Sequence, residues 1–199
     1  MHMLNNYINH LPEDNKYAVI DVEAHERCQR HILEVGVAIV DYAKGSIQPH
    51  HFVIEEHYKT RNKKFVPDNK DNYDYGDSVM ISQEHIAVQI HHLLQDVDCV
   101  VGHAVKSDIK WLRRLGIQVD KSMDTQKLYK CAMWEPQAAS VKTMIETLLR
   151  EEPKHLHNAG NDAYYTARCF MHLRSLICSR GKAIMNPYLH EGQAIGVGA

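Results

Sequence analysis

The chain of 199 residues, 44% of them hydrophobic, is long enough for one domain with a substantial core and too short for two comfortable ones. Its formal charge of −2 gives no overall basic surface, which argues against tight, sequence-independent binding of duplex nucleic acid. No stretch approaches the roughly 20 apolar residues of a membrane span, and the N-terminus lacks the pattern of a signal peptide. We therefore expect a soluble intracellular protein, cytoplasmic or nuclear, without membrane partners.

The first third of the chain predicts three sequential strands. Residues 17–22 and 32–41 are apolar runs rich in β-favouring residues, which is typical of central strands. A third strand at 52–54 follows the turn-forming residues 44–46, so the simplest arrangement is an antiparallel meander. Residues 57–80 have no periodicity and predict a long loop, which in a compact domain is often functional.

Helical spacing starts in the middle of the chain. The apolar residues from Ile86 to Leu94 predict a helix over about residues 82–96, with Ser82 as its N-cap. Strands first, followed by strands that alternate with helices, predict an α/β sheet with helices on both sides. Residues 180–199 contain several glycines and predict a loose tail. The other expected elements are a strand at 99–101, a helix over 105–115, a short strand within 117–124, and helices over about 125–133, 140–150 and 162–179.

Two carboxylates end the first strand. Residues two apart on a strand project to the same side, so Asp21 and Glu23 share one face while Val22 packs on the other. An isolated Asp-x-Glu pair is usually no more than two exposed acids at a strand end. Here the strand is expected to be central, and adjacent buried like charges are costly there unless a cation compensates them.

Two further segments carry chemistry of the same kind. Gly102 lets the chain turn after the strand at 99–101, and Asp108 then falls early in a helix, where the helix dipole alone also favours an acid. Five residues of α-helix would rotate His157 roughly 140° away from Asp162. The two side chains converge only if His157 precedes the helix, and a histidine with a pKa near neutrality is suited to accept a proton from water.

Together these three segments resemble the motifs of the DEDDh family of 3′–5′ exonucleases, a branch of the ribonuclease H-like fold. The sister family has tyrosine four residues before the last aspartate, and position 158 here is Asn, so the histidine class fits. Residues 32–38 and 124–128 look like the family's second strand and its fifth strand with the following helix. The matching motifs are Asp21-Val22-Glu23, Gly102-His103-x4-Asp108 and His157-x4-Asp162.

The resemblance implies a fold, an activity and a set of site residues. The fold would be α/β and ribonuclease H-like, with a central mixed five-stranded sheet flanked by helices over residues 17–179, after an N-terminal extension over 1–16. The substrate would be nucleic acid, with single-stranded RNA favoured over DNA, and the oligomeric state stays open. His157 would be the general base, and two divalent cations, Mg²⁺ or Mn²⁺, would be held by Asp21, Glu23, Asp108 and Asp162.

Some details refine this resemblance and others depart from it. The segments 21–26, 75–78 and 157–163 look closest to a mainly fungal branch that is linked to RNA interference and mRNA export. Ala24 stands where the family commonly has Thr, and Ala104 where it commonly has Asn. These departures affect contacts with the end of the substrate more than they affect metal binding.

Two alternatives stay open. A catalytically silent nucleic-acid or protein-binding module would keep the fold and some of the acids, although the intact set of five residues argues against it. Maelstrom domains share the fold, and many of them hold zinc through a Glu-Cys-His-Cys set. The cysteines of this chain stand at wide, irregular spacings without a Cys-x-x-Cys pair, so no compact Cys/His cluster is obvious.

The segment of residues 58–65 combines two aromatic residues with four positive charges. Such a composition can follow phosphates and stack on exposed bases. A solvated loop would have the same composition. The four charges are those of Lys59, Arg61, Lys63 and Lys64.

Overall fold

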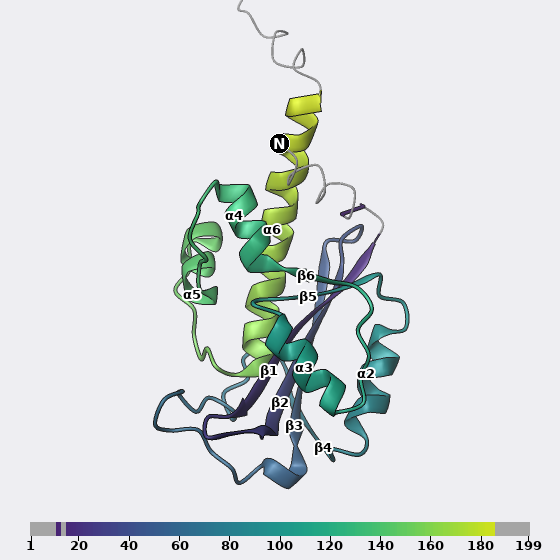
Figure 1. Cartoon of the computed structure of the whole chain (residues 1–199), viewed down its shortest axis with the longest axis vertical. Helices are drawn as coiled ribbons and strands as arrows, with labels where there is room; N and C mark the ends of the chain where they lie inside the picture. The colour runs from purple at the N-terminus through teal and green to yellow at the C-terminus, as the bar shows by residue number, and fades with distance from the viewer. Residues whose placement is uncertain (1–10, 13–14, 186–199) are drawn as a thin grey trace, which may run out of the picture.

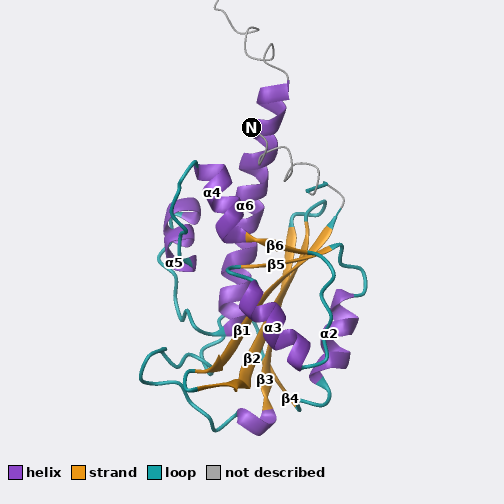
Figure 2. Cartoon of the chain, in the orientation of Figure 1, coloured by secondary structure: helices purple, strands orange, loops and turns teal. Residues whose placement is uncertain are grey.

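The computed structural model describes residues 11–12 and 15–185, with side chains described as far as Arg180. Its strands form one mixed sheet in the order β4-β3-β2-β1-β5-β6 (Figure 2). The predicted α/β architecture is confirmed, but the sheet has six strands rather than five. The strands span Lys16–His25 (β1), Cys28–Asp41 (β2), Ser46–Ile54 (β3), Ser78–Ile81 (β4), Cys99–Gly102 (β5) and Ser122–Asp124 (β6).

The strand that carries the first motif, β1, lies inside the sheet. It pairs antiparallel with β2 along its length and parallel with β5. Because β2 also pairs antiparallel with β3, the predicted meander is confirmed. The additional strand, β4, pairs in parallel with β3 at the edge of the sheet, and all but its last residue belong to the segment expected to be a loop. Its side chains are mostly exposed, so it has no buried periodicity that would reveal it in the sequence.

Helices cover both faces of the sheet, over two separate cores (Figure 1). Helices α4, α5 and α6 pack on one face against Tyr17 and Val19, whereas α2 and α3 pack on the other against Ala18 and Ile20. Consecutive residues of β1 therefore enter opposite cores, which accounts for its continuous apolar run. The helices span Glu55–His57 (η1), Ile86–Leu94 (α2), Lys106–Arg114 (α3), Thr125–Met133 (α4), Val141–Met144 (α5), Ile145–Leu149 (η2) and Ala159–Met185 (α6).

Several element boundaries differ from the predictions. Helix α2 is shorter than expected, and Ser82 is not its N-cap, because the Ser82 hydroxyl lies 2.7 Å from Nδ1 of His85 instead of capping the helix. The strand expected within 117–124 is limited to β6. The helix expected over 140–150 is divided into α5 and η2, which is a π-helical turn.

The last helix is longer than predicted at both ends. It begins at Ala159 rather than at Asp162, and it continues to Met185, beyond the expected start of the loose tail at 180. The rest of that tail, 186–199, and residues 1–10 and 13–14 of the expected N-terminal extension lie outside the described residues. Within the described part of the chain, no helix is long and apolar enough to cross a membrane.

Candidate active site

The end of β1 carries two of the predicted site residues. Asp21 and Glu23 alternate with Val22, which belongs to the core under α2 and α3, so both acids face the side covered by α6. On the neighbouring β2, Gly36 stands opposite Asp21, and Glu34 stands opposite Glu23. The register shifts directly after Glu23. Such a bulge bends the end of a strand and re-aims its side chains.

A tight turn after β5 brings Asp108 to the same region. A β-carbon on Gly102 would lie 2.6 Å from Cγ2 of Val105, so glycine permits the close approach with which this turn begins. Ala104 follows with φ of 54°, in the left-handed region, and its N–H donates to Oδ1 of Asp124 at 3.1 Å. Asp108 then lies buried in the first turn of α3.

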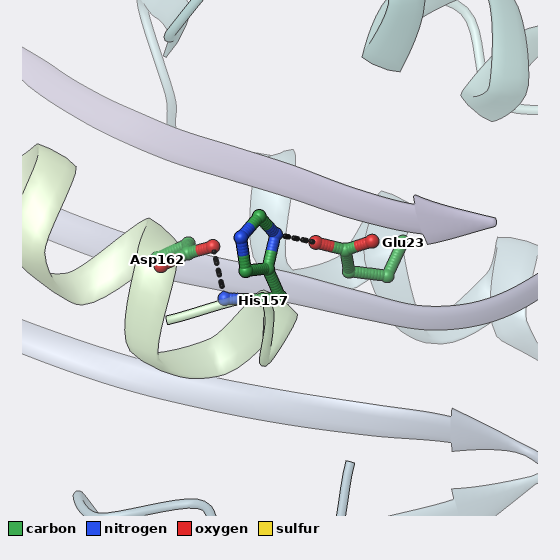
Figure 3. A group of neighbouring side chains, drawn as sticks. All are labelled: Glu23, His157 and Asp162. Carbon is green, nitrogen blue, oxygen red and sulfur yellow. Dashed lines mark hydrogen bonds and ion pairs between the residues drawn. The ribbon is translucent and has the colours of Figure 1, made fainter. Parts of the chain in front are cut away.

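The third motif places His157 between two carboxylates. His157 precedes α6 with φ of 66°, and its backbone N–H donates to Oδ2 of Asp162 at 2.9 Å. Its imidazole Nδ1 lies 3.6 Å from Oε1 of Glu23 (Figure 3). Asn158 caps the helix, because its Oδ1 accepts a hydrogen bond from the N–H of Asn161 at 3.0 Å. This cap fixes the turn between His157 and the helix.

Burial and neighbouring negative charge act together on the carboxyl groups. Burial, followed by the charges of Asp162 and Asp108, holds the pKa of Asp21 well above its ordinary value. Burial also raises the pKa of Asp108 to about 7 and the pKa of Asp162 to about 7. The ion pair with Glu23 raises the pKa of His157. The site is therefore a place where negative charge is unfavourable unless a cation compensates it.

The residues fit a divalent cation. Among the described residues, Oδ2 of Asp21 and Oδ1 of Asp162 are buried without a hydrogen-bond partner. One ligand atom from each of Glu23, His157 and Asp162 lies within 4.8 Å of the other two. Asp21 and Asp108 are outside that group of three, but they are close enough that, in addition to burial, the charges of Asp162 and Glu23 raise the pKa of Asp21, and the charge of Glu23 raises the pKa of Asp108. The carboxylate oxygens among these residues suit hard cations such as Mg²⁺ or Mn²⁺.

A buried pair behind these residues was not predicted from the sequence. Nε2 of His51 on β3 lies 2.9 Å from Oε2 of Glu34, and its Nδ1 lies 2.8 Å from Oγ of Ser78 on β4. Glu34 and His51 are only 3% and 1% exposed. The same Glu34 oxygen accepts a hydrogen bond from the N–H of Ala159, at the start of α6, at 3.3 Å. The pair therefore joins three strands to the helix that carries Asp162.

Most of the chain matches one protein family in sequence. The family model described as "DNA polymerase III subunit epsilon-like, C-terminal domain", a DEDDh model, matches residues 16–173. All five predicted site residues fall within that range.

Three fungal proteins are similar in sequence. The uncharacterized protein YDR514C of Saccharomyces cerevisiae is 32% identical, over 74% of this chain and 38% of its own length. The uncharacterized nucleolar protein C2C4.08 of Schizosaccharomyces pombe is 33% identical, over 76% of this chain and 65% of its own. "Good for full DBP5 activity protein 2" of S. cerevisiae is 30% identical, over 76% of this chain and 34% of its own length. The chain thus spans about a third to two thirds of the length of these relatives.

A solved nuclease-containing structure is similar in fold. The catalytic unit of Neurospora crassa Pan2, which contains a protease and a nuclease domain, aligns with a TM-score of 0.57 and 15% identity. The alignment covers 92% of this chain and 30% of the Pan2 chain. At this level of identity, the likeness shows a shared fold, and it agrees with the expected ribonuclease H-like arrangement.

Proposed function

The chain belongs to the DEDDh family, and on this premise we propose that it is a metal-dependent 3′–5′ exonuclease. It hydrolyses phosphodiester bonds in nucleic acid, with single-stranded RNA favoured over DNA. The domain that does so comprises residues 17–179, continued by the last turns of α6. The nucleolar name of the S. pombe relative supports a nuclear or cytoplasmic location.

One observation carries this proposal. Side chains from β1, from the turn before α6 and from the first turn of α6 converge around buried carboxyl groups that no positive charge within the described ranges neutralises. Glu23, His157 and Asp162 lie together, and Asp21 and Asp162 each have a buried oxygen without a partner among the described residues. The residues that would hold two cations are Asp21, Glu23, Asp108 and Asp162. Bound divalent cations supply electrostatic stabilisation of the phosphoryl oxygens and lower the pKa of water.

His157 is the residue that would accept the proton of the attacking water. Its side chain is 47% exposed, so water can reach the ring. Its Nδ1 is oriented by Glu23, and its backbone is held by Asp162. In the metal-free protein, the contact with Glu23 raises the pKa of His157, which favours acceptance of a proton by the ring. The substrate's terminal nucleotide would lie beside this ring.

The zinc-binding alternative finds no support in the described residues. The group of His, Cys, Asp and Glu side chains that could hold a metal there contains no cysteine. The five cysteines, which are free, are distributed between buried and partly buried positions. A silent binding module of the same fold is the other alternative, and an activity assay decides between it and the exonuclease.

The assay uses linear single strands of RNA and DNA of one sequence, each labelled at its 5′ end, together with a circular form of each. With Mn²⁺, we expect the labelled linear strands to shorten progressively and to release nucleoside 5′-monophosphates, faster for RNA. The circles should stay intact, and EDTA should stop the reaction. Cutting of the circles would make the protein an endonuclease, and intact linear strands would favour the silent module.

A further inference from the structure

The long loop between η1 and β4, residues 58–77, has an ordered interior of its own. The ammonium group of Lys70, a residue only 1% exposed, donates hydrogen bonds to the carbonyl oxygens of His57, Tyr58 and Thr60 at 3.4, 3.3 and 2.7 Å. Arg61 forms ion pairs with Asp68 and Asp71 on the other arm of the loop. The loop is therefore held in one shape by a buried cation and an internal ion-pair network.

Hydrogen bonds attach this loop to both sides of the candidate active site. On one side, the Asn62 side chain donates to the carbonyl of Ala24, directly after Glu23, and accepts from the N–H of Glu26. On the other side, Asn69 donates to the carbonyl of Leu156, directly before His157. Figure 2 shows loop segments gathered around this end of β1 and β2. The loop thus borders the site from the first motif to the third.

The carboxylate of Glu26 holds the backbone of the basic part of the loop, whose side chains are exposed to solvent. Glu26 accepts backbone hydrogen bonds from Lys64, Phe65 and Val66 at 2.8 to 3.2 Å, which lower the pKa of Glu26. The backbone is therefore fixed at the very residues whose side chains point outward. Phe65 is 69% exposed, and Lys63 and Lys64 are exposed beside it.

Exposed apolar surface is unfavourable in water, so an aromatic ring held in solvent gains free energy when a binding partner covers it. Nζ of Lys64 lies 5.1 Å from the centre of the Phe65 ring, so positive charge adjoins the ring. By contrast, the positive charge of Arg61 is already neutralised by its ion pairs with aspartates of the loop, and its guanidinium lies over the ring of Tyr58. Tyr58 and Lys59 are exposed as well, but the Tyr58 ring lies under the Arg61 guanidinium. At 63–65, a more exposed ring stands beside two exposed lysines on a backbone that Glu26 holds.

We propose that Lys63, Lys64 and Phe65 form a preformed platform for the single strand next to the nucleotide being removed. Phe65 stacks on one base, and the two lysines contact the adjoining phosphates, which offsets the repulsion between the strand and the acidic site. Because stacking needs an unpaired base, the platform selects single-stranded substrate. This inference rests on the proposed exonuclease function, since it assigns the strand that leads to that site.

Binding is measured in an Asp108→Asn background, with a 5′-labelled oligouridine strand, Mn²⁺ and increasing salt, by fluorescence anisotropy. Phe65→Ala should weaken binding by about 5- to 100-fold with an unchanged salt slope, and Phe65→Trp should restore it. Lys63→Ala with Lys64→Ala should instead reduce the salt slope by about 1.4, because each phosphate contact on a single strand contributes about 0.7.

The controls are matched residues on α4 and at its C-cap, away from the loop (Figure 1). Trp134 is an aromatic residue with 67% exposure, and Lys127 and Lys130 are an exposed pair. Trp134→Ala and Lys127→Ala with Lys130→Ala should leave binding and salt slope unchanged. Binding by Phe65→Ala within about twofold of its parent, or a loss equal to that of Trp134→Ala, would overturn the platform.

A second substrate separates the platform from the proposed function. The p-nitrophenyl ester of thymidine 5′-monophosphate has a phosphodiester but no preceding nucleotides. If the platform is right, Phe65→Ala in the otherwise native chain lowers kcat/KM for the oligouridine strand and leaves it unchanged for the ester. Equal loss on both substrates, or no loss on either, would reject the platform while the exonuclease function stands. Phe65-dependent strand binding without hydrolysis of either substrate would reject the exonuclease and keep the platform.

Discussion

A β-carbon added to Gly36 would lie 1.8 Å from the carbonyl oxygen of Ala159. The backbone of β2 and the first turn of α6 are thus in direct contact, at a distance that no side chain permits. Gly36 also stands opposite Asp21 in the sheet. One contact therefore sets the separation between the strand that carries Asp21 and the helix that carries Asp162.

Gly36→Ala should displace the first turn of α6 and lower both stability and hydrolysis, by about 1–3 kcal/mol in the free energy of unfolding. Denaturant unfolding and a rate assay at a temperature where the variant is folded check this. Gly45→Ala is the control, because Gly45 has φ of +64° but nothing within 4 Å of the new β-carbon. That control should lose some stability and keep its activity. A fully active and stable Gly36→Ala variant would show that the contact does not position the site.

The central strands and most helices could be predicted from the sequence, because their apolar residues follow the period of a strand or a helix. Helix α4 has the limits that were predicted for it. The edge strand β4 could not be predicted from the sequence, because its side chains are mostly exposed and only its pairing with β3 defines it. The predicted N-cap of α2 was wrong, because the Ser82 hydroxyl contacts the His85 side chain instead of the helix N-terminus. Sequence spacing does not reveal this contact.

For the candidate site, sequence spacing predicted that His157 precedes its helix, and the structure shows this arrangement. The Glu34–His51 pair was missed, although Glu34 is a charged residue inside an apolar run, which is a usable signal. Its partner stands on another strand, and strand register cannot be read from composition. The anchoring of the loop by Lys70 and Glu26 likewise depends on contacts between distant segments.

The buried pair of Glu34 and His51 should behave as one unit. Glu34→Leu or His51→Leu alone leaves a buried polar partner unpaired and should cost on the order of 3–5 kcal/mol. The double variant should cost less than the sum of the two, as measured by a double-mutant cycle in denaturant. Strict additivity would show that the two side chains are not coupled.

Asp108→Asn should stabilise the metal-free protein at alkaline pH. The pKa of Asp108 rises from an ordinary value of 3.8 to about 7 on folding, so the folded state binds more protons between these values. Stability from this group is therefore present at low pH and is lost as the pH rises through that window. In EDTA at pH above that window, the variant should melt at least about 2 °C higher than the unmodified protein.

Addition of Mn²⁺ to both proteins is the control for this melting experiment. Mn²⁺ should raise the melting temperature of the unmodified protein and raise that of Asp108→Asn much less, because a ligand of the cation is missing. A variant that melts lower in EDTA above pH 7, or that gains as much from Mn²⁺, would contradict the clustered-carboxylate account.

His157→Ala should slow hydrolysis by about 10²–10⁴-fold and leave Mn²⁺ binding intact, because the imidazole serves as a base rather than as a ligand. Calorimetric titration with Mn²⁺ and single-turnover rates check the two parts. His155→Ala is the control, since His155 lies nearby but pairs with Asp74 instead of Glu23. Loss of the Mn²⁺ signal in His157→Ala would make His157 a metal ligand.

The most direct test of the central claim compares rates of hydrolysis of a 5′-labelled RNA strand, with Mn²⁺, by the unmodified protein, Asp108→Asn and Asp124→Asn. Asp124 caps α4 and holds the turn before α3, and its amide replacement keeps an oxygen for both bonds. The account predicts that Asp108→Asn loses about 10³-fold or more while folded, and that Asp124→Asn keeps most of its activity. A folded Asp108→Asn protein that hydrolyses the strand at a rate close to that of the unmodified protein would contradict it.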